Sequence, residues 1–151
     1  MRRMIALMLV AGAVWYPPPP AAAQTPWAML ARRALGRVEQ LRQEPQGKSP
    51  GYEAASVLLD VPADLVFAKM SAMVRANHAV RIIAVDSAKR RFDLAQGDRT
   101  VSLSVSPVSE QISQLLVVGN VVAGEASATS HVVATVLRVC RELQKHCSAG
   151  E

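Results

Sequence analysis

The most reactive side chains of the sequence gather near the C-terminus, where Cys140, His146 and Cys147 lie within eight residues. Thiolate and imidazole groups are common zinc ligands. In a continuous helix, however, positions 140 and 147 would be about 10.5 Å apart along the axis, at a rise of about 1.5 Å per residue. One zinc ion would not reach both thiols unless the chain bent between them. We therefore predict no metal site at this cluster.

The same separation bears on a disulfide between Cys140 and Cys147. A disulfide requires Cα atoms within roughly 7 Å of each other, so the bond forms only if the helix stops near Leu143 and the tail turns back. An oxidising compartment would favour it. Otherwise Cys140 is a buried apolar residue, and Cys147 is a thiol in the tail that can pair with another molecule. The sequence leaves both alternatives open.

Nucleophilic catalysis requires a serine or cysteine beside a base that a third group orients. The sequence has no Gly-x-Ser-x-Gly motif and no glycine-rich phosphate loop, and most of its serines follow the pattern of a solvent-facing strand. Asp86, Asp93 and Asp98 fall in or near expected strands and turns, where aspartate ordinarily caps a turn or ends a strand. We expect no catalytic site, no cofactor and no enzymatic activity.

The N-terminus has the three parts of a secretory signal. A positive Met-Arg-Arg start precedes an uncharged apolar run over residues 4–15, and three alanines follow four prolines. This run is shorter than the roughly 20 residues that cross a bilayer. We predict cleavage between Ala23 and Gln24, which removes residues 1–23 and makes the mature protein periplasmic or secreted. An uncleaved anchor with a polyproline spacer and a proline-rich recognition tract are the alternatives.

Composition limits the classes of partner. Half of the residues are apolar but only 4% are aromatic, which predicts one domain with an aliphatic core. The formal charge of +5 falls to +3 without residues 1–23, because 15 basic side chains then stand against 12 acidic ones. This excess is small compared with the basic surface of a nucleic-acid-binding domain. We therefore expect no nucleic-acid partner.

Residues 24–43 have the spacing of an amphipathic helix, with apolar side chains on one stripe. Such a helix either packs on its own domain or contacts a partner protein or an anionic membrane surface, and its arginines would make that contact. The arginines concerned are Arg32, Arg33 and Arg37. Segment 44–51 contains two prolines and two glycines, so we predict a linker between the helix and the domain that follows.

Residues 52–147 predict an α+β domain, with residues 148–151 as a tail. The expected element order is β-α-β-β-β-β-α, with strands and helices at residues 54–60, 62–77, 80–86, 91–96, 99–107, 113–122 and 128–146. Hairpin-length connections make the last four strands an antiparallel β-meander. Two helices with apolar stripes are expected to cover one face of the sheet.

Residues 99–107 alternate most regularly. Val101, Leu103 and Val105 fall on one face of the expected strand, and Ser102 and Ser104 fall on the other. Such alternation is typical of a strand with one buried and one hydrated face. The hydrated face, with its serines, is a candidate interaction surface.

The stretch "VLLDVPADLVFAKMSAMVRANHAVRIIAVD" at residues 57–86 resembles the opening of small bacterial envelope domains of the helix-grip or BamC-like type. In these domains a strand ends in an Asp-x-Pro corner, a helix follows, and the next strand ends in Asp. The matching positions are Asp60, Pro62, Val66, Phe67 and Asp86. Domains of this type act as accessory interaction modules without catalytic residues, so the resemblance implies an accessory role and transfers no site. Unlike the lipoproteins among them, this chain has no cysteine near the predicted cleavage position.

Together these observations predict an exported, non-enzymatic accessory or interaction domain of the bacterial cell envelope. Its partner would be another envelope protein, bound through the serine-bearing face of the sheet or the basic N-terminal helix. The alternative is a carrier of a small apolar ligand held between the sheet and its helices, because the many small side chains leave space there.

Overall fold

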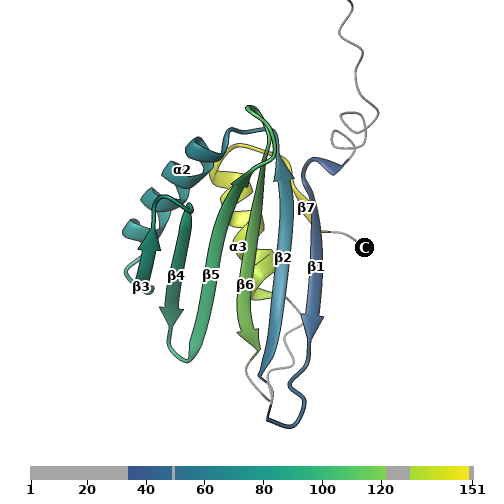
Figure 1. The fold of residues 1–151 in the computed structure, drawn as a ribbon, viewed down its shortest axis with the longest axis vertical. Helices are drawn as coiled ribbons and strands as arrows, with labels where there is room; N and C mark the ends of the chain where they lie inside the picture. The colour runs from purple at the N-terminus through teal and green to yellow at the C-terminus, as the bar shows by residue number, and fades with distance from the viewer. Residues whose placement is uncertain (1–33, 49, 122–129, 150–151) are drawn as a thin grey trace, which may run out of the picture.

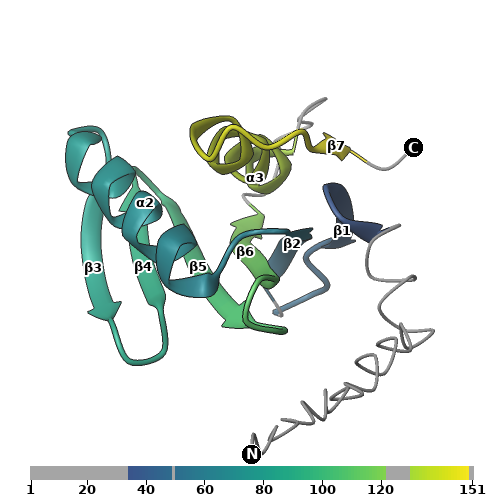
Figure 2. The same ribbon diagram turned by 90° about the horizontal axis from the view of Figure 1, so that it is seen from above.

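The computed structural model of the protein describes residues 34–48, 50–121 and 130–149. The elements in these ranges are β1 (Arg37–Gln43), β2 (Gly51–Leu59), α2 (Ala63–Ala76), β3 (Arg81–Asp86), β4 (Arg91–Gln96), β5 (Arg99–Pro107), β6 (Ser113–Val121), α3 (His131–Glu142) and β7 (Ser148–Ala149). The strands form one seven-stranded sheet in the order β3-β4-β5-β6-β2-β1-β7. Both helices lie on the same face of this sheet (Figures 1 and 2). The predicted α+β class is confirmed.

The predicted antiparallel meander is confirmed for β3, β4, β5 and β6, each of which pairs with the next. Strand β5 has the predicted buried and hydrated faces. Leu103 and Val105 are buried under the helices, and Ser102 and Ser104 lie on the opposite face. The Gly97-Asp98 pair forms the tight β4–β5 turn, with Gly97 at φ +59°.

The core lies between the helices and the inner face of the sheet. Its largest fully buried side chains are Phe92, Leu59, Met70, Leu115, Val57, Val66, Val105, Val117, Val132 and Val136. The rings of Phe67 on α2 and Phe92 on β4 stack with their centroids 5.0 Å apart. Each buried side chain of this size stabilises the fold by about 1.5–3 kcal/mol relative to an exposed position, so this aliphatic layer holds the helices on the sheet.

The prediction of a helix through residue 43 is wrong for residues 37–43, which form strand β1. This strand pairs antiparallel with β2, from Val38 opposite Val57 to Gln43 opposite Tyr52. The pairing supplies partners for the β2 backbone, whereas a helix would leave the β2 edge open. Gly36, at φ +74°, sits immediately before β1 in a conformation that ends helical geometry. The earlier part of the predicted helix, including Arg32 and Arg33, lies outside the described residues, as does the predicted cleavage position at Ala23 and Gln24.

The predicted boundaries of the domain also need correction. Segment 44–51 is not a linker between a helix and a domain: residues 44–50 connect two paired strands, and Gly51 begins β2. The tail predicted at 148–151 contains strand β7, which runs parallel to β1. The sheet therefore extends beyond the range 52–147 at both ends. Sequence patterns missed these strands because only one residue of β1, Val38, is buried.

Helix α3 is shorter than predicted. Its N-cap is Ser130, whose hydroxyl accepts a hydrogen bond from the backbone N–H of Val133 at 3.1 Å. It ends at Glu142, and the chain turns through Gln144 at φ +56°. In the described parts of the chain, neither helix is long and apolar enough to cross a membrane.

The turn after α3 brings Cys140 and Cys147 together in a disulfide, with their Cα atoms 6.1 Å apart. The geometric condition for this bond, a helix that stops near Leu143, is met. Beyond the disulfide, the backbone N–H of Ser148 donates to the carbonyl of Gly36 at 2.9 Å. The disulfide therefore ties the end of α3 to the segment that pairs with β1.

Candidate functional site

A cavity of about 630 Å³ opens between the two helices and the inner face of the sheet. Helix α2 packs over β5 and β6, whereas α3 packs over β6, β2 and β1. Both helices cover the same face of the sheet (Figure 2), and residues of α2, α3, β4 and β5 line the cavity. Small-molecule sites in proteins typically enclose about 300–1,000 Å³, so its size suits a small ligand.

Part of the cavity lining is apolar. The sheet contributes Leu94 and Leu103, and α2 contributes Met70, all of which are buried. Further apolar lining comes from Met73, Val74, Val80, Val101 and Val139. An apolar lining without buried charges favours the body of an apolar ligand, because burying a polar group there without a partner would be costly.

Charged and polar groups stand at the mouth of the cavity. Lys69 on α2 and Glu142 on α3 form an ion pair there, with 3.8 Å between Nζ and Oε2. Their side chains are 44% and 50% exposed, so the pair holds the helices together only weakly. Arg138 is exposed one helical turn before Glu142 and also lines the cavity. Among the lining residues, only these three side chains carry a formal charge.

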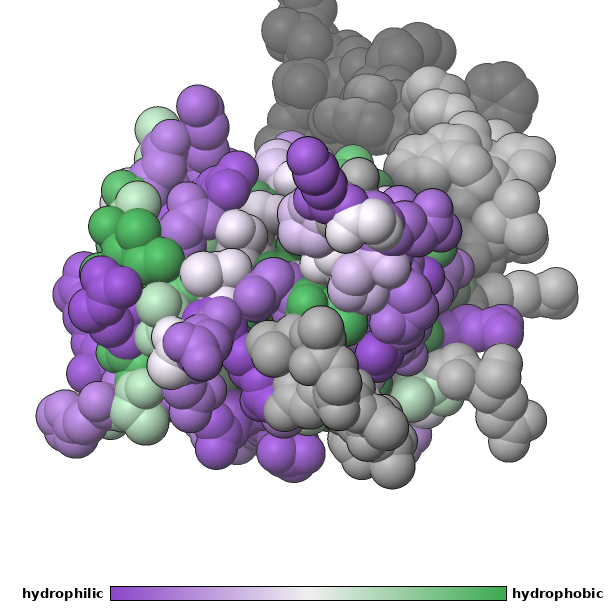
Figure 3. Space-filling view, turned by 90° about the horizontal axis from the view of Figure 1, so that it is seen from below, coloured by the Kyte–Doolittle hydropathy of each residue, from purple (hydrophilic) through white to green (hydrophobic). Residues whose placement is uncertain are grey.

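The surface seen from below is mostly hydrophilic, with a hydrophobic patch on the side where Figure 1 places β3 (Figure 3). Strand β3 is an edge strand, and its side chains Ile82, Ile83 and Val85 are 39%, 50% and 44% exposed. This patch is distinct from the cavity, since none of the three side chains lines it.

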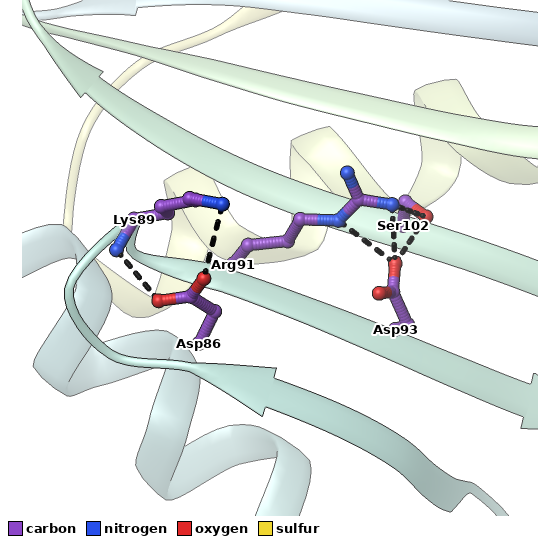
Figure 4. Close-up of polar contacts among 5 residues, drawn as sticks. All are labelled: Asp86, Lys89, Arg91, Asp93 and Ser102. Carbon is purple, nitrogen blue, oxygen red and sulfur yellow. Dashed lines mark hydrogen bonds and ion pairs between the residues drawn. The ribbon is translucent and has the colours of Figure 1, made fainter.

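The serines predicted to bind a partner lie on the face of the sheet that the helices leave open. Figure 4 shows Ser102 engaged with its neighbours: its hydroxyl donates to Asp93, and Arg91 donates to Asp93 at 3.0 and 2.9 Å. Both hydrogen bonds lower the pKa of the Asp93 carboxyl, and the one from Ser102 has the larger effect. Asp86 accepts from the backbone N–H of Lys89 at 2.9 Å and so caps its turn as expected. Asp93 instead lies within β4, where its carboxylate accepts the hydrogen bonds from Ser102 and Arg91.

The predicted interaction residues do not form one cluster. Arg37 begins β1, and both β6 and β2 lie between β1 and the strand that carries Ser102 and Ser104. Leu41, Tyr52 and Leu116 are exposed apolar side chains on the open face of the sheet.

The cluster of Cys140, His146 and Cys147 has a structural role. Both thiols are joined in the disulfide and do not remain as metal ligands. Across the described ranges, no three His, Cys, Asp or Glu side chains come together in a way that would hold a metal ion.

Sequence reasoning placed a ligand between the sheet and the helices only in general terms and named no lining residue. Both methionines of α2 line the cavity, Met70 as a buried core residue and Met73 as a half-buried one. The i, i+4 spacing of Arg138 and Glu142 places both side chains on the same face of their helix. Only the position of α2 shows that this face borders the cavity.

Comparison with protein-family models and with curated proteins gives no match. Among solved structures, the chain is similar to a conserved protein of unknown function from Enterococcus faecalis, with 6% identity and a TM-score of 0.49 over 70% of this chain and 74% of that one. It is also similar to CalU16 from Micromonospora echinospora, at 12% identity and a TM-score of 0.43 over 71% and 78%. A third is the Zhui aromatase/cyclase from Streptomyces sp. R1128, at 12% identity and 0.38 over 71% and 87%. Likenesses this distant carry no functional argument.

Proposed function

We propose that this protein binds a small, largely apolar ligand in the cavity between α2, α3, β4 and β5, and acts as its carrier. The observation that carries this proposal is the cavity itself, a space of about 630 Å³ that is open to solvent and has apolar and polar lining residues beside a well-packed core. A space of this size with an apolar lining is the default site for a ligand.

The expected affinity follows from the apolar surface. A ligand that buried about 200 Å² of apolar area would gain about 5 kcal/mol, at roughly 25 cal/mol per Å², before the entropy of association is subtracted. A gain of about 5 kcal/mol corresponds to a dissociation constant of about 0.2 mM before that cost, so constants in the millimolar range are expected for such a ligand. Lys69, Arg138 and Glu142 are the charged side chains of the cavity lining, and all three are exposed.

We also propose that the protein acts in the periplasm or outside the cell. The predicted secretory signal supports this location, and the Cys140–Cys147 disulfide is compatible with it because such bonds persist in oxidising compartments. Periplasmic localisation is tested by fractionation of cells that express the full chain, followed by mass determination of the mature N-terminus.

The cavity is tested with N-phenyl-1-naphthylamine, a neutral dye that fluoresces in apolar surroundings. Met73→Trp places a larger side chain in the cavity. Leu65→Trp is the matched control, because Leu65 lies on the same helix, is 60% exposed and does not line the cavity. We expect saturable dye binding at one site, weakened in Met73→Trp and unchanged in Leu65→Trp. A folded wild-type protein that shows no saturable fluorescence increase would overturn the proposal.

An accessory role in the cell envelope, with another envelope protein as partner, is the second candidate. Leu41, Tyr52 and Leu116 are exposed on the open face of the sheet and favour it. Leu116→Asp would weaken recovery of a stoichiometric partner during native purification and leave dye binding unchanged. If the variant retains such a partner fully, the open face is not the contact surface.

A further inference from the structure

The mouth of the cavity carries an excess positive charge. Of the three charged lining side chains, Lys69 and Glu142 form an ion pair, and its 3.8 Å separation makes it a loose one. Arg138 has no ion pair with another residue in the described ranges of the chain. The charged lining side chains therefore sum to one formal positive charge, and within the described residues no further ion pair offsets it.

The guanidinium at this position suits an anionic group. Arginine stays charged at all ordinary pH values and presents a planar set of donors that matches a carboxylate or phosphate in two parallel hydrogen bonds. Arg138 shares the cavity-facing side of α3 with the buried Val139. A ligand whose body contacts Val139 would thus place its end near Arg138.

We propose that the ligand is an amphiphile with an apolar body and a single anionic head, either a carboxylate or a phosphate monoester. Its body fills the apolar cavity, and its head contacts Arg138, with Lys69 as a second cation across the mouth. This proposal rests on the proposed function of the same cavity. Neutral and cationic amphiphiles with the same chain would bind more weakly, because they leave the charge of Arg138 without a partner.

Glu142 provides a second, opposite test of the proposal. Its carboxylate lies one turn from Arg138 and already contacts Lys69, so it competes with an anionic head for both cations. Removing this charge in Glu142→Gln should tighten the binding of anions and leave neutral ligands unaffected. Removing the cation in Arg138→Gln should have the opposite effect on anions.

The test measures displacement of N-phenyl-1-naphthylamine by four ten-carbon ligands at pH 8 and low ionic strength, below their micelle concentrations. These are decanoate, decyl phosphate, decanol and decyltrimethylammonium. We expect both anions to displace the dye at about fivefold lower concentration than decanol, the range of a partly exposed ion pair. Decyltrimethylammonium should be the weakest. The comparison of decanoate with decyl phosphate identifies which head group the site prefers.

Three variants locate the effect. Arg138→Gln should lose about fivefold in affinity for the anions, and Glu142→Gln should gain by a similar factor. Arg141→Gln is the control, because it removes the same charge from the same helix at an exposed position that does not line the cavity. It should change anion binding less than twofold. Circular dichroism checks that each variant is folded.

Two results would overturn the proposal, and they can be told apart. If decanol competes as well as the anions, or Arg138→Gln and Arg141→Gln behave alike, the anionic head is wrong while the apolar carrier remains. If the dye itself does not bind the folded wild-type protein, the carrier function fails and the head group fails with it.

Discussion

Loss of the Cys140–Cys147 disulfide should destabilise the whole domain. The bond closes a loop of eight residues, counting both cysteines, since their sequence separation is 7. In the chain-entropy model, a loop of this length corresponds to about 2.5 kcal/mol at 25 °C. The tail that the bond holds contributes β7, which pairs with β1 at the edge of the sheet. The expected loss is therefore a large fraction of the roughly 5–15 kcal/mol that stabilises a typical domain.

The measurement is urea denaturation of the oxidised protein, the reduced protein and Cys147→Ser, followed by far-UV circular dichroism. At a denaturant dependence of about 1–3 kcal/mol per molar urea, reduction should lower the midpoint by roughly 1–2 M. The variant should match the reduced protein, and reductant should not change it further. Cys147 is preferred over Cys140 for substitution because Cys140 is buried and would leave a cavity.

Two results would refute this reasoning. Free thiols in the oxidised, denatured protein would show that the bond is absent. A shift in the free energy of unfolding below about 0.5 kcal/mol on reduction would show that the bond, though present, does not constrain the unfolded chain as the entropy model requires.

Three further substitutions test the fold. Gly36→Ala should lower the free energy of unfolding by about 1–3 kcal/mol in urea denaturation, because a Cβ at φ +74° would collide with the carbonyl oxygen of His146; an unchanged midpoint would contradict this packing. Ser113→Ala should cost about 1–2 kcal/mol, because the fully buried hydroxyl donates to the carbonyl of Val61 at 2.8 Å; a neutral result would refute that bond. The lowered pKa of Asp93 stabilises the fold above its unfolded pKa of about 4, and this contribution is lost as the pH falls through the folded pKa. Asp93→Asn should therefore flatten the acid side of the stability profile, measured as midpoint against pH from 7 to 3, and an unchanged acid side would contradict the shift.

The site was predictable only in outline. The many small side chains indicated space between sheet and helices, but the cavity depends on how α2 and α3 are placed on the sheet. That placement brings together lining residues more than 60 positions apart in the chain, Met70 on α2 and Val139 on α3 among them. No local pattern reports such a distance. Arg138 is an ordinary exposed arginine in the sequence and becomes a candidate ligand contact only beside the opening.

The sequence by itself determined the elements whose residues alternate or repeat within a single segment. The period-two pattern of β5, the apolar stripe of α2 and the short β4–β5 turn are encoded locally, because each element buries one regular face. Only the tertiary structure decided that residues 37–43 form a strand, since just Val38 of that strand is buried and its pairing with β2 and β7 supplies the rest. It also decided the disulfide, which depends on where α3 ends. Pairing and packing between distant segments depend on the free energy of the whole fold. A local sequence pattern reports only the burial of its own segment, so it cannot predict them.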